Sequence, residues 1–242
     1  MLLVFIDETA DAKFKDYFGF CVATINSMYY PLIKKEACKI LQEIGWDPSI
    51  EFKGSYLFSA SSGCSDVEIE KRILAANKLL DLNTASRNRR MAFNFGRLKS
   101  TDKREDYIHG VPGLLNKVLP RAPKGAGKNL ISITCDERDD ITASELHKRL
   151  APCATKKGYV LLENVVRAKS SFDTIGIMYA DLVGYLAGRI DNISNDSELF
   201  EGLTQEQLQM NGKIKKLQSS KQLLSKVKGL TLYRPKIVQR AP

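Results

Sequence analysis

Three aspartates interrupt apolar stretches of the chain, where acidic side chains are well placed to take part in catalysis. Asp7 follows the apolar run Met1–Ile6, and Asp136 follows the apolar run Leu130–Cys135. Asp181 lies inside an apolar segment with helical spacing. Three carboxylates directed into one place repel one another unless a divalent cation compensates their charge. Oxygen ligands without His or Cys favour Mg²⁺ or Mn²⁺.

Asp181 is the most unusual of the three because it shares a helical face with Gly184 and Gly188. Each interior glycine costs a helix about 1 kcal/mol relative to alanine. Two glycines on one face therefore favour close packing of that face against a sheet. Such packing would bury Asp181, and a buried carboxylate needs cations or hydrogen-bond donors nearby.

Each aspartate also has a purely structural interpretation. Asp7 and Asp136 could begin ordinary turns, which aspartate favours. Asp181 could be a buried carboxylate that pairs with a basic residue such as Arg167. Spacing alone leaves both interpretations open.

The elements that must position these aspartates follow from the period of the apolar residues. Strands are expected at Met1–Asp7, Phe18–Ile25, Asn88–Leu98, Leu130–Cys135 and Gly158–Val165. Helices are expected at Pro31–Ile44, Asp66–Leu82, Thr101–Leu119, Thr142–Leu150, Phe172–Ile190 and Ile214–Val227. Without residues 26–86, three strands precede alternating helices and strands, an order that favours a mixed sheet with helices on both faces. This order is similar to that of the ribonuclease-H-like α/β fold.

We therefore expect an α/β domain over residues 1–192, with a helical insertion at about 26–86 after the second strand. Residues 193–242 are expected to form a basic extension packed on or beside that domain. The 242 residues are 43% hydrophobic and 27% charged, which excludes disordered and fibrous architectures.

The first apolar run is too short to span a membrane and lacks the preceding basic residue of a signal peptide. Five widely spaced cysteines and two histidines make a disulfide framework or a zinc site unexpected. We expect a cytoplasmic protein with no membrane partner; the sequence does not indicate its oligomeric state.

The net charge of +9 resides in the C-terminal part of the chain. Leu208–Pro242 holds nine basic residues and no acidic residue, so the rest of the chain is neutral. Such a segment favours polyanions, since each phosphate that it neutralises releases a counterion. A solvated, lysine-rich terminal helix would have the same composition.

Four segments resemble the landmarks of a bacterial and phage family known as domain of unknown function 3800. They are Phe5-Ile-Asp-Glu-Thr-Ala-Asp, Glu51-Phe-Lys-Gly-Ser, Thr134-Cys-Asp-Glu and Gly176-Ile-Met-Tyr-Ala-Asp-Leu-Val-Gly-Tyr. The resemblance covers about Met1 to Ile190. Three positions depart from the family pattern, with Thr9 in place of Ser, Met178 in place of Gln and Gly184 in place of Ala.

The resemblance implies a ribonuclease-H-like fold and metal-dependent nuclease activity. By position it makes Asp7, Asp136 and Asp181 the metal-binding carboxylates, with Glu8 in a supporting role as a further ligand. It places Glu51 and Lys53 in supporting roles in catalysis. Ribonuclease-H folds often take a further Glu from the helix after the third strand, which here would be Glu105, and the sequence leaves the choice between Glu51 and Glu105 open.

The predicted function is hydrolysis of phosphodiester bonds in RNA or DNA with two Mg²⁺ or Mn²⁺ ions. Asp7 would bridge the ions, while Asp136 and Asp181 would each hold one. The residues expected to bind the nucleic acid are Arg87, Arg89, Arg90, Lys213, Lys215, Lys216 and Lys221. Two alternatives remain: an inactive nucleic-acid-binding protein on the same fold, and a nucleotide-hydrolysing relative, against which Glu8-Thr9 argues because glycine is needed there.

Overall fold

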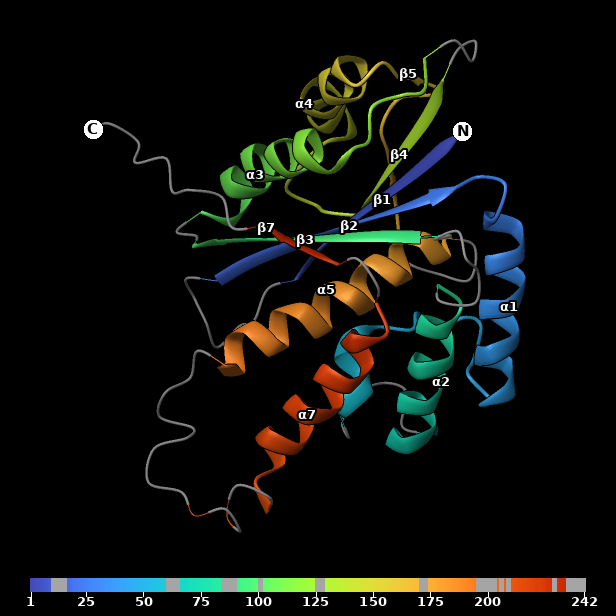
Figure 1. The fold of residues 1–242 in the computed structure, drawn as a ribbon, viewed down its shortest axis with the longest axis vertical. Coiled ribbons are helices and arrows are strands. Elements are labelled where there is room, and N and C mark those ends of the chain that lie inside the picture. The colour runs from blue at the N-terminus through green and yellow to red at the C-terminus, as the bar shows by residue number, and fades with distance from the viewer. Residues whose placement is uncertain are drawn as a thin grey trace.

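The computed structural model describes eleven parts of the chain: residues 1–9, 17–59, 66–83, 91–99, 102–124, 129–169, 174–194, 204, 207, 210–227 and 230–233. Within these parts, a seven-stranded sheet separates two groups of helices (Figure 1). No helix in the described parts is both long and apolar enough to cross a membrane.

The sheet has mixed strand directions. Its strands are β1 (Leu2–Thr9), β2 (Tyr17–Asn26), β3 (Met91–Lys99), β4 (Leu130–Asp136), β5 (Val160–Leu161), β6 (Val166–Ala168) and β7 (Thr231–Tyr233). The order is β5-β4-β1-β2-β3-β7, and β6 also pairs with β4. The first three strands form an antiparallel meander, whereas β4 runs parallel to β1. Together with helices on both faces, this arrangement confirms the ribonuclease-H-like α/β fold.

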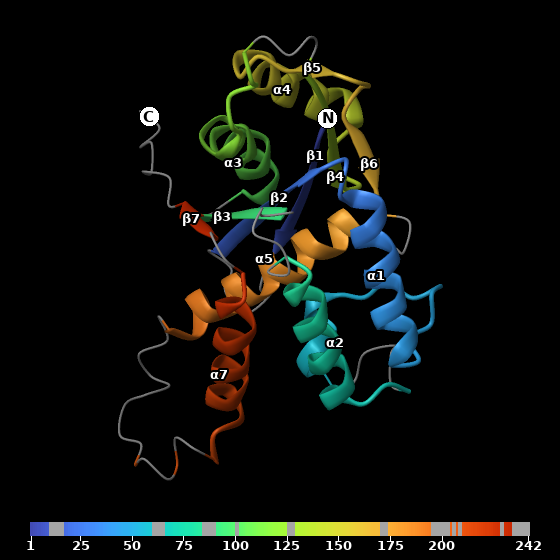
Figure 2. The same ribbon diagram turned by 45° about the vertical axis from the view of Figure 1, so that its right-hand side comes forward.

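The helices divide between the two faces of the sheet (Figures 1 and 2). They are α1 (Tyr30–Glu43), the short 3₁₀ helix η1 (Gly54–Phe58), α2 (Ile69–Asp81), α3 (Lys103–Val118), α4 (Ala143–Lys156), α5 (Ile175–Ser194) and α7 (Gly212–Ser225). Helices α3 and α4 cover one face, and α5 crosses the other, with α1, α2 and α7 beyond it. Along β1, Val4 and Ile6 pack with α3 and α4, whereas Phe5 packs with α5.

Two predicted elements differ from the structure. Helix α4 continues past Leu150 to Lys156. Proline usually ends a helix, but here Pro152 lies within α4. Its beginning was correctly predicted, since Thr142 forms a capping box with Glu145. The strand expected at Gly158–Val165 is replaced by the short strands β5 and β6, which both pair with β4.

The C-terminal extension packs against the core. On α7 and just beyond it, the apolar residues Ile214, Leu217, Leu223 and Val227 are buried. Lys226 forms an ion pair with Asp81 of α2 at 2.7 Å. Strand β7, which the sequence analysis did not anticipate, extends the sheet by pairing in parallel with β3.

Candidate carboxylate site

Asp7 and Asp136 lie side by side at one end of the sheet. In the parallel pairing of β1 with β4, Ile6 is opposite Cys135, so the next residues of the two strands are neighbours. Side chains alternate along a strand, and Asp7 therefore shares the face of Phe5, which is the face that α5 covers. Asp7 is only 6% exposed, and its carboxylate accepts the N–H of Glu8 at 2.7 Å. It lies inside β1 and does not begin a turn.

Asp181 reaches the same place from α5. A Cβ at Gly176 would overlap the ring of Phe5, and one at Gly184 would lie 3.1 Å from the Cβ of Cys21. Cys21 is the partner of Asp7 in β2. The close approach of the Gly184 face to the sheet is thus confirmed, and it directs Asp181, one turn earlier on that face, toward the end of β1.

The backbone of η1 fixes the Asp181 carboxylate. The N–H of Gly54 donates to Oδ2 of Asp181 at 2.5 Å. A Cβ at Gly54 would lie 2.5 Å from the Cβ of Tyr185, so only glycine lets η1 approach α5 this closely. Sequence reasoning missed this donor, although the glycine in Glu51-Phe-Lys-Gly-Ser was a visible signal.

An aromatic and cationic contact holds the other end of η1 against α5. The rings of Phe58 and Tyr185 stack with centroids 6.5 Å apart. The guanidinium of Arg189 lies 5.2 Å from the centroid of the Phe58 ring and donates to the hydroxyl of Tyr185. These contacts keep Gly54 in place over Asp181.

The three aspartates act on one another electrostatically. Burial raises the pKa of Asp7 well above its ordinary value, and the charges of Asp181 and Asp136 raise it further. Burial raises the pKa of Asp181 to about 7, even though the N–H of Gly54 opposes that shift. Burial also raises the pKa of Asp136. Each of the three carboxylates is therefore harder to ionise than a free aspartate.

Glu51 and Lys53 accompany the aspartates. They form an ion pair at 2.9 Å. The charge of Glu51 raises the pKa of both Asp136 and Asp181, whereas the charge of Lys53 lowers it. Both residues therefore lie within electrostatic reach of the aspartates.

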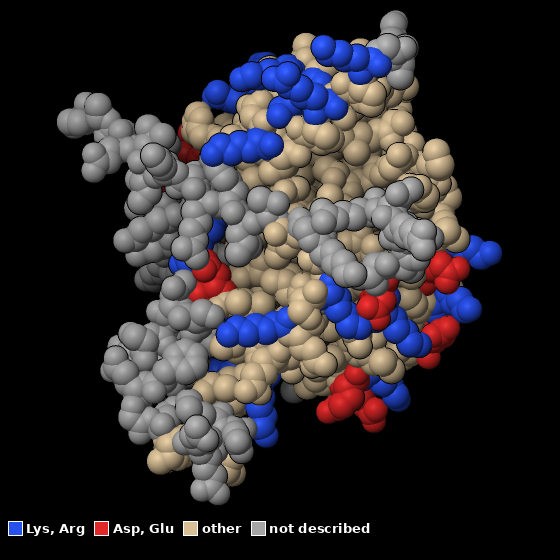
Figure 3. Space-filling view, in the orientation of Figure 1, with Lys and Arg blue, Asp and Glu red and all other residues tan. Residues whose placement is uncertain are grey.

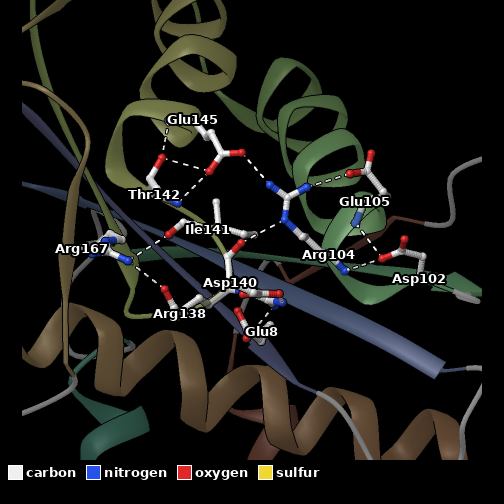
Figure 4. Close-up of polar contacts among 10 residues, drawn as sticks. All are labelled: Glu8, Asp102, Arg104, Glu105, Arg138, Asp140, Ile141, Thr142, Glu145 and Arg167. Atoms are coloured by element: carbon white, nitrogen blue, oxygen red, sulfur yellow. Dashed lines mark hydrogen bonds and ion pairs between the residues drawn. The ribbon is translucent and has the colours of Figure 1, made fainter.

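Glu105, the other candidate for the fourth acid, is on α3 at the opposite face of the sheet. It contacts Arg104 at 2.8 Å (Figure 4). It also contacts His109 at 3.3 Å. The geometry therefore favours Glu51 over Glu105 as the companion of the three aspartates.

Glu8 alternates with Asp7 along β1 and turns toward the face of α3. Its carboxylate pairs with Arg138 at 2.7 Å, and Arg138 also pairs with Asp140 at 2.7 Å (Figure 4). Burial raises the pKa of Glu8 to about 7, while the charge of Arg138 opposes the shift. This pairing binds Glu8 to the loop after β4, and its role as a metal ligand stays a prediction.

The basic residues expected to bind nucleic acid fall into two groups. Arg87, Arg89 and Arg90 lie outside the described residues. On α7, the residues Lys213, Lys215 and Lys221 are exposed and Lys216 is partly buried.

Arg167 does not serve as the partner of Asp181. Its guanidinium donates to the carbonyls of Arg138 and Ile141, at 2.8 and 2.9 Å, whereas Asp181 accepts the N–H of Gly54. The structural interpretation of Asp181 as half of a pair with Arg167 is therefore wrong.

Carboxylate oxygens are the donors that this site can offer a metal. Among the described residues, no three His, Cys, Asp or Glu side chains already have their donor atoms arranged around a metal position. The aspartates would have to turn toward a common ion. Their chemistry fits a hard cation such as Mg²⁺ or Mn²⁺, since the site supplies oxygen and no imidazole.

Comparison with known proteins gives structural similarity at low sequence identity. No family model and no curated protein sequence matches the chain. One similar structure is that of the complex of PCNA with RNase HII from Archaeoglobus fulgidus, with a TM-score of 0.44 and 9% identity over 100% of this chain and 98% of that chain. Another is ribonuclease H2 from Pyrococcus horikoshii OT3, with a TM-score of 0.46 and 11% identity over 94% of this chain and 99% of that chain.

The contact between Gly54 and α5 predicts a specific loss of stability. Gly54→Ala should lower the free energy of unfolding by about 1–3 kcal/mol, because the added methyl group forces η1 away from Tyr185. Gly113→Ala is the matched control, since a Cβ there meets nothing within 4 Å and alanine favours a helix. Urea unfolding followed by circular dichroism measures both variants, and equal stabilities would contradict the close contact.

The raised pKa values predict how stability depends on pH without metal. Between about pH 4 and 7 the folded chain binds more protons than the unfolded chain, because the pKa of Asp181 rises from 3.8 to about 7 on folding. Metal-free protein should therefore lose stability as the pH rises from 5.5 to about 8. Asp181→Asn, which can still accept the N–H of Gly54, should reduce this loss. Melting temperatures of both proteins, measured in EDTA over this pH range, test the prediction. The same pH dependence in the variant as in the unaltered chain would contradict it.

Proposed function

We propose that this protein is a metal-dependent nuclease that hydrolyses phosphodiester bonds of RNA or DNA. The observation that carries the proposal is the convergence of Asp7, Asp136 and Asp181 from β1, β4 and α5 into one electrostatically coupled group. Acids whose pKa values are raised in this way are destabilising when ionised, and such clusters are characteristic of functional sites. Membership in the domain of unknown function 3800 family is part of the same proposal.

The three aspartates would hold the Mg²⁺ or Mn²⁺ ions. When bound, such ions lower the pKa of the attacking water and stabilise the leaving oxygen. The repulsion that raises the pKa values of the aspartates is the same repulsion that a divalent cation relieves. The fit of the site to these ions therefore rests on charge as well as on donor type.

The residues around the aspartates would orient them and attract the substrate. The N–H of Gly54 holds one oxygen of Asp181 and leaves the other oxygen free to bind a ligand. Lys53 keeps 41% of its side chain exposed and is held by Glu51, so its ammonium group can contact a substrate phosphate beside the aspartates. Glu51 would fix Lys53 and add a fourth carboxylate.

The exposed lysines of α7 would hold the substrate backbone. The buried residues of α7 anchor the helix on α5, while Lys213, Lys215 and Lys221 face solvent. Packing and nucleic-acid binding are therefore compatible functions of one helix. Arg87, Arg89 and Arg90 remain proposed contacts of the same kind.

A nucleotide-hydrolysing relative is a weaker proposal. Such proteins need backbone close to phosphate directly after the first aspartate, which glycine allows. Here β1 continues in extended conformation through Glu8 and Thr9, and the Glu8 side chain is engaged with Arg138.

Replacement of the first aspartate tests the nuclease mechanism. Asp7→Asn should reduce cleavage by at least about a hundredfold, or roughly 2.7 kcal/mol of transition-state stabilisation, because it removes a charged ligand. Glu51→Gln should also reduce cleavage, whereas Glu105→Gln on the opposite face should not. The measurement is cleavage of labelled RNA and DNA with Mg²⁺, Mn²⁺ or EDTA.

Two outcomes of this experiment would contradict the proposal. Unchanged cleavage by purified Asp7→Asn would exclude the aspartate mechanism. Binding of nucleic acid without metal-dependent cleavage by the unaltered chain would instead identify an inactive nucleic-acid-binding protein.

Neutralising the exposed lysines of α7 tests their part in substrate binding. The triple variant Lys213→Gln, Lys215→Gln and Lys221→Gln should weaken binding and flatten the slope of log affinity against log salt. The expected change is about 0.9 per lost phosphate contact for duplex DNA, or about 0.7 for single strands. Turnover at saturating substrate should change much less, since the aspartates are untouched.

A charge-matched control separates this effect from net charge alone. Lys35→Gln, Lys39→Gln and Lys71→Gln remove three exposed charges from α1 and α2. Equal weakening of binding by the two triple variants would make the effect one of net charge. If the α7 variant retains the affinity and salt slope of the unaltered chain, α7 does not bind the nucleic acid.

A further inference from the structure

An open hollow lies between helices α3 and α4, on the face of the sheet opposite to α5. Its volume is about 330 Å³, at the lower end of the range for small-ligand sites. Both helices contribute to its walls, and none of the candidate carboxylate residues lines it. Whatever binds here would therefore bind apart from the proposed metal site.

The rim of the hollow is cationic. Lys148, Arg149 and Lys156 of α4 line it, and all three are exposed. No acidic residue lines the hollow, and none of these three cations forms an ion pair within the described parts of the chain. Figure 3 shows Lys and Arg side chains gathered over α3 and α4. Unbalanced positive charge around a concave surface favours an anionic ligand.

Three residues that line the hollow carry hydrogen-bond acceptors whose usual donor is missing. Pro112 and Pro152 lie inside α3 and α4 and line the hollow. In a helix, each carbonyl normally accepts the N–H of the residue four positions later. Proline has no N–H, so the carbonyl of Ile108 lacks this donor because of Pro112, and the carbonyl of Lys148 lacks it because of Pro152. Ile108 and Lys148 also line the hollow. The amide oxygen of Asn116 is also buried in this wall and has no hydrogen-bond partner.

These two features together define the chemistry of the ligand. The acceptors and proline rings fit a flat, apolar group that carries N–H donors, and the cationic rim fits a phosphate. We infer that the hollow between α3 and α4 binds a nucleoside 5′-phosphate, with the base inside and the phosphate at Lys148, Arg149 and Lys156. Its source is either a free nucleotide or the phosphorylated end of a nucleic-acid strand.

Titration of the full chain in EDTA tests this site independently of the carboxylates and of the proposed nuclease function. Isothermal titration calorimetry with the four nucleoside 5′-monophosphates should show saturable binding of at least one. That nucleotide should bind at least about tenfold more tightly than its nucleoside or inorganic phosphate. A 5′-phosphorylated oligonucleotide compared with its 5′-hydroxyl form distinguishes a strand end from a free nucleotide as the source.

Variants assign the binding to the hollow. The triple variant Lys148→Gln, Arg149→Gln and Lys156→Gln should weaken nucleotide binding at least about tenfold. The triple variant Lys35→Gln, Lys39→Gln and Lys71→Gln, which removes the same charge from α1 and α2, should leave it unchanged. Asn116→Leu should weaken nucleotide binding and leave the binding of inorganic phosphate unchanged, because it removes an interior acceptor without altering charge. Circular dichroism verifies that each variant is folded.

Three outcomes would overturn the inference. The first is no saturable binding of any nucleotide at millimolar concentration. The second is inorganic phosphate binding as tightly as the nucleotide, which would reduce the hollow to an anion patch. The third is equal weakening by the two triple variants, which would make the effect one of net charge.

Discussion

Repulsion among three crowded carboxylates, one buried and two partly buried, is the constraint on which the rest of this structure depends. Asp7 and Asp136 are neighbours because β1 and β4 pair in parallel, and Asp181 joins them because α5 packs closely on the sheet. Burial and mutual charge raise their pKa values, so this arrangement opposes folding unless protons or cations compensate it. A fold that retains such a cluster has a use for it, which is why the proposed function starts from these three residues.

The surroundings of the cluster hold it in place from both faces of the sheet. On the α5 face, η1 delivers the N–H of Gly54 to Asp181 and is itself held by Phe58, Tyr185 and Arg189. On the other face, arginine side chains hold the loop after β4 through hydrogen bonds and ion pairs (Figure 4). Arg138 links it to Glu8, and Arg167 of β6 donates to two of its carbonyls.

Ion pairs extend this second network to the helices. Arg104 of α3 donates to Glu145 of α4 at 2.5 Å and to the carbonyl of Asp140 at 2.9 Å. The loop that follows Asp136 is therefore held by contacts with β1, β6 and α3, as a site that must hold charged ligands in a set geometry requires.

Much of this arrangement could be predicted from local sequence, and the rest depends on contacts between distant segments. The ends of the apolar runs located Asp7 and Asp136, and the glycines of α5 indicated the close packing near Asp181. The three-residue strand β7 is too short to show a period, and its pairing with β3 joins residues far apart in sequence. The choice of Glu51 over Glu105 likewise depends on which face of the sheet each element covers, which spacing along the chain does not determine.

The most direct measurement of the central claim is anomalous X-ray scattering from crystals of the full chain soaked in Mn²⁺. Manganese should bind at the carboxylates of Asp7, Asp136 and Asp181, with the oxygen atoms turned toward the ion, and it should be lost from the Asp7→Asn variant. Absence of manganese from these three residues, under conditions in which the protein cleaves nucleic acid, would contradict the account.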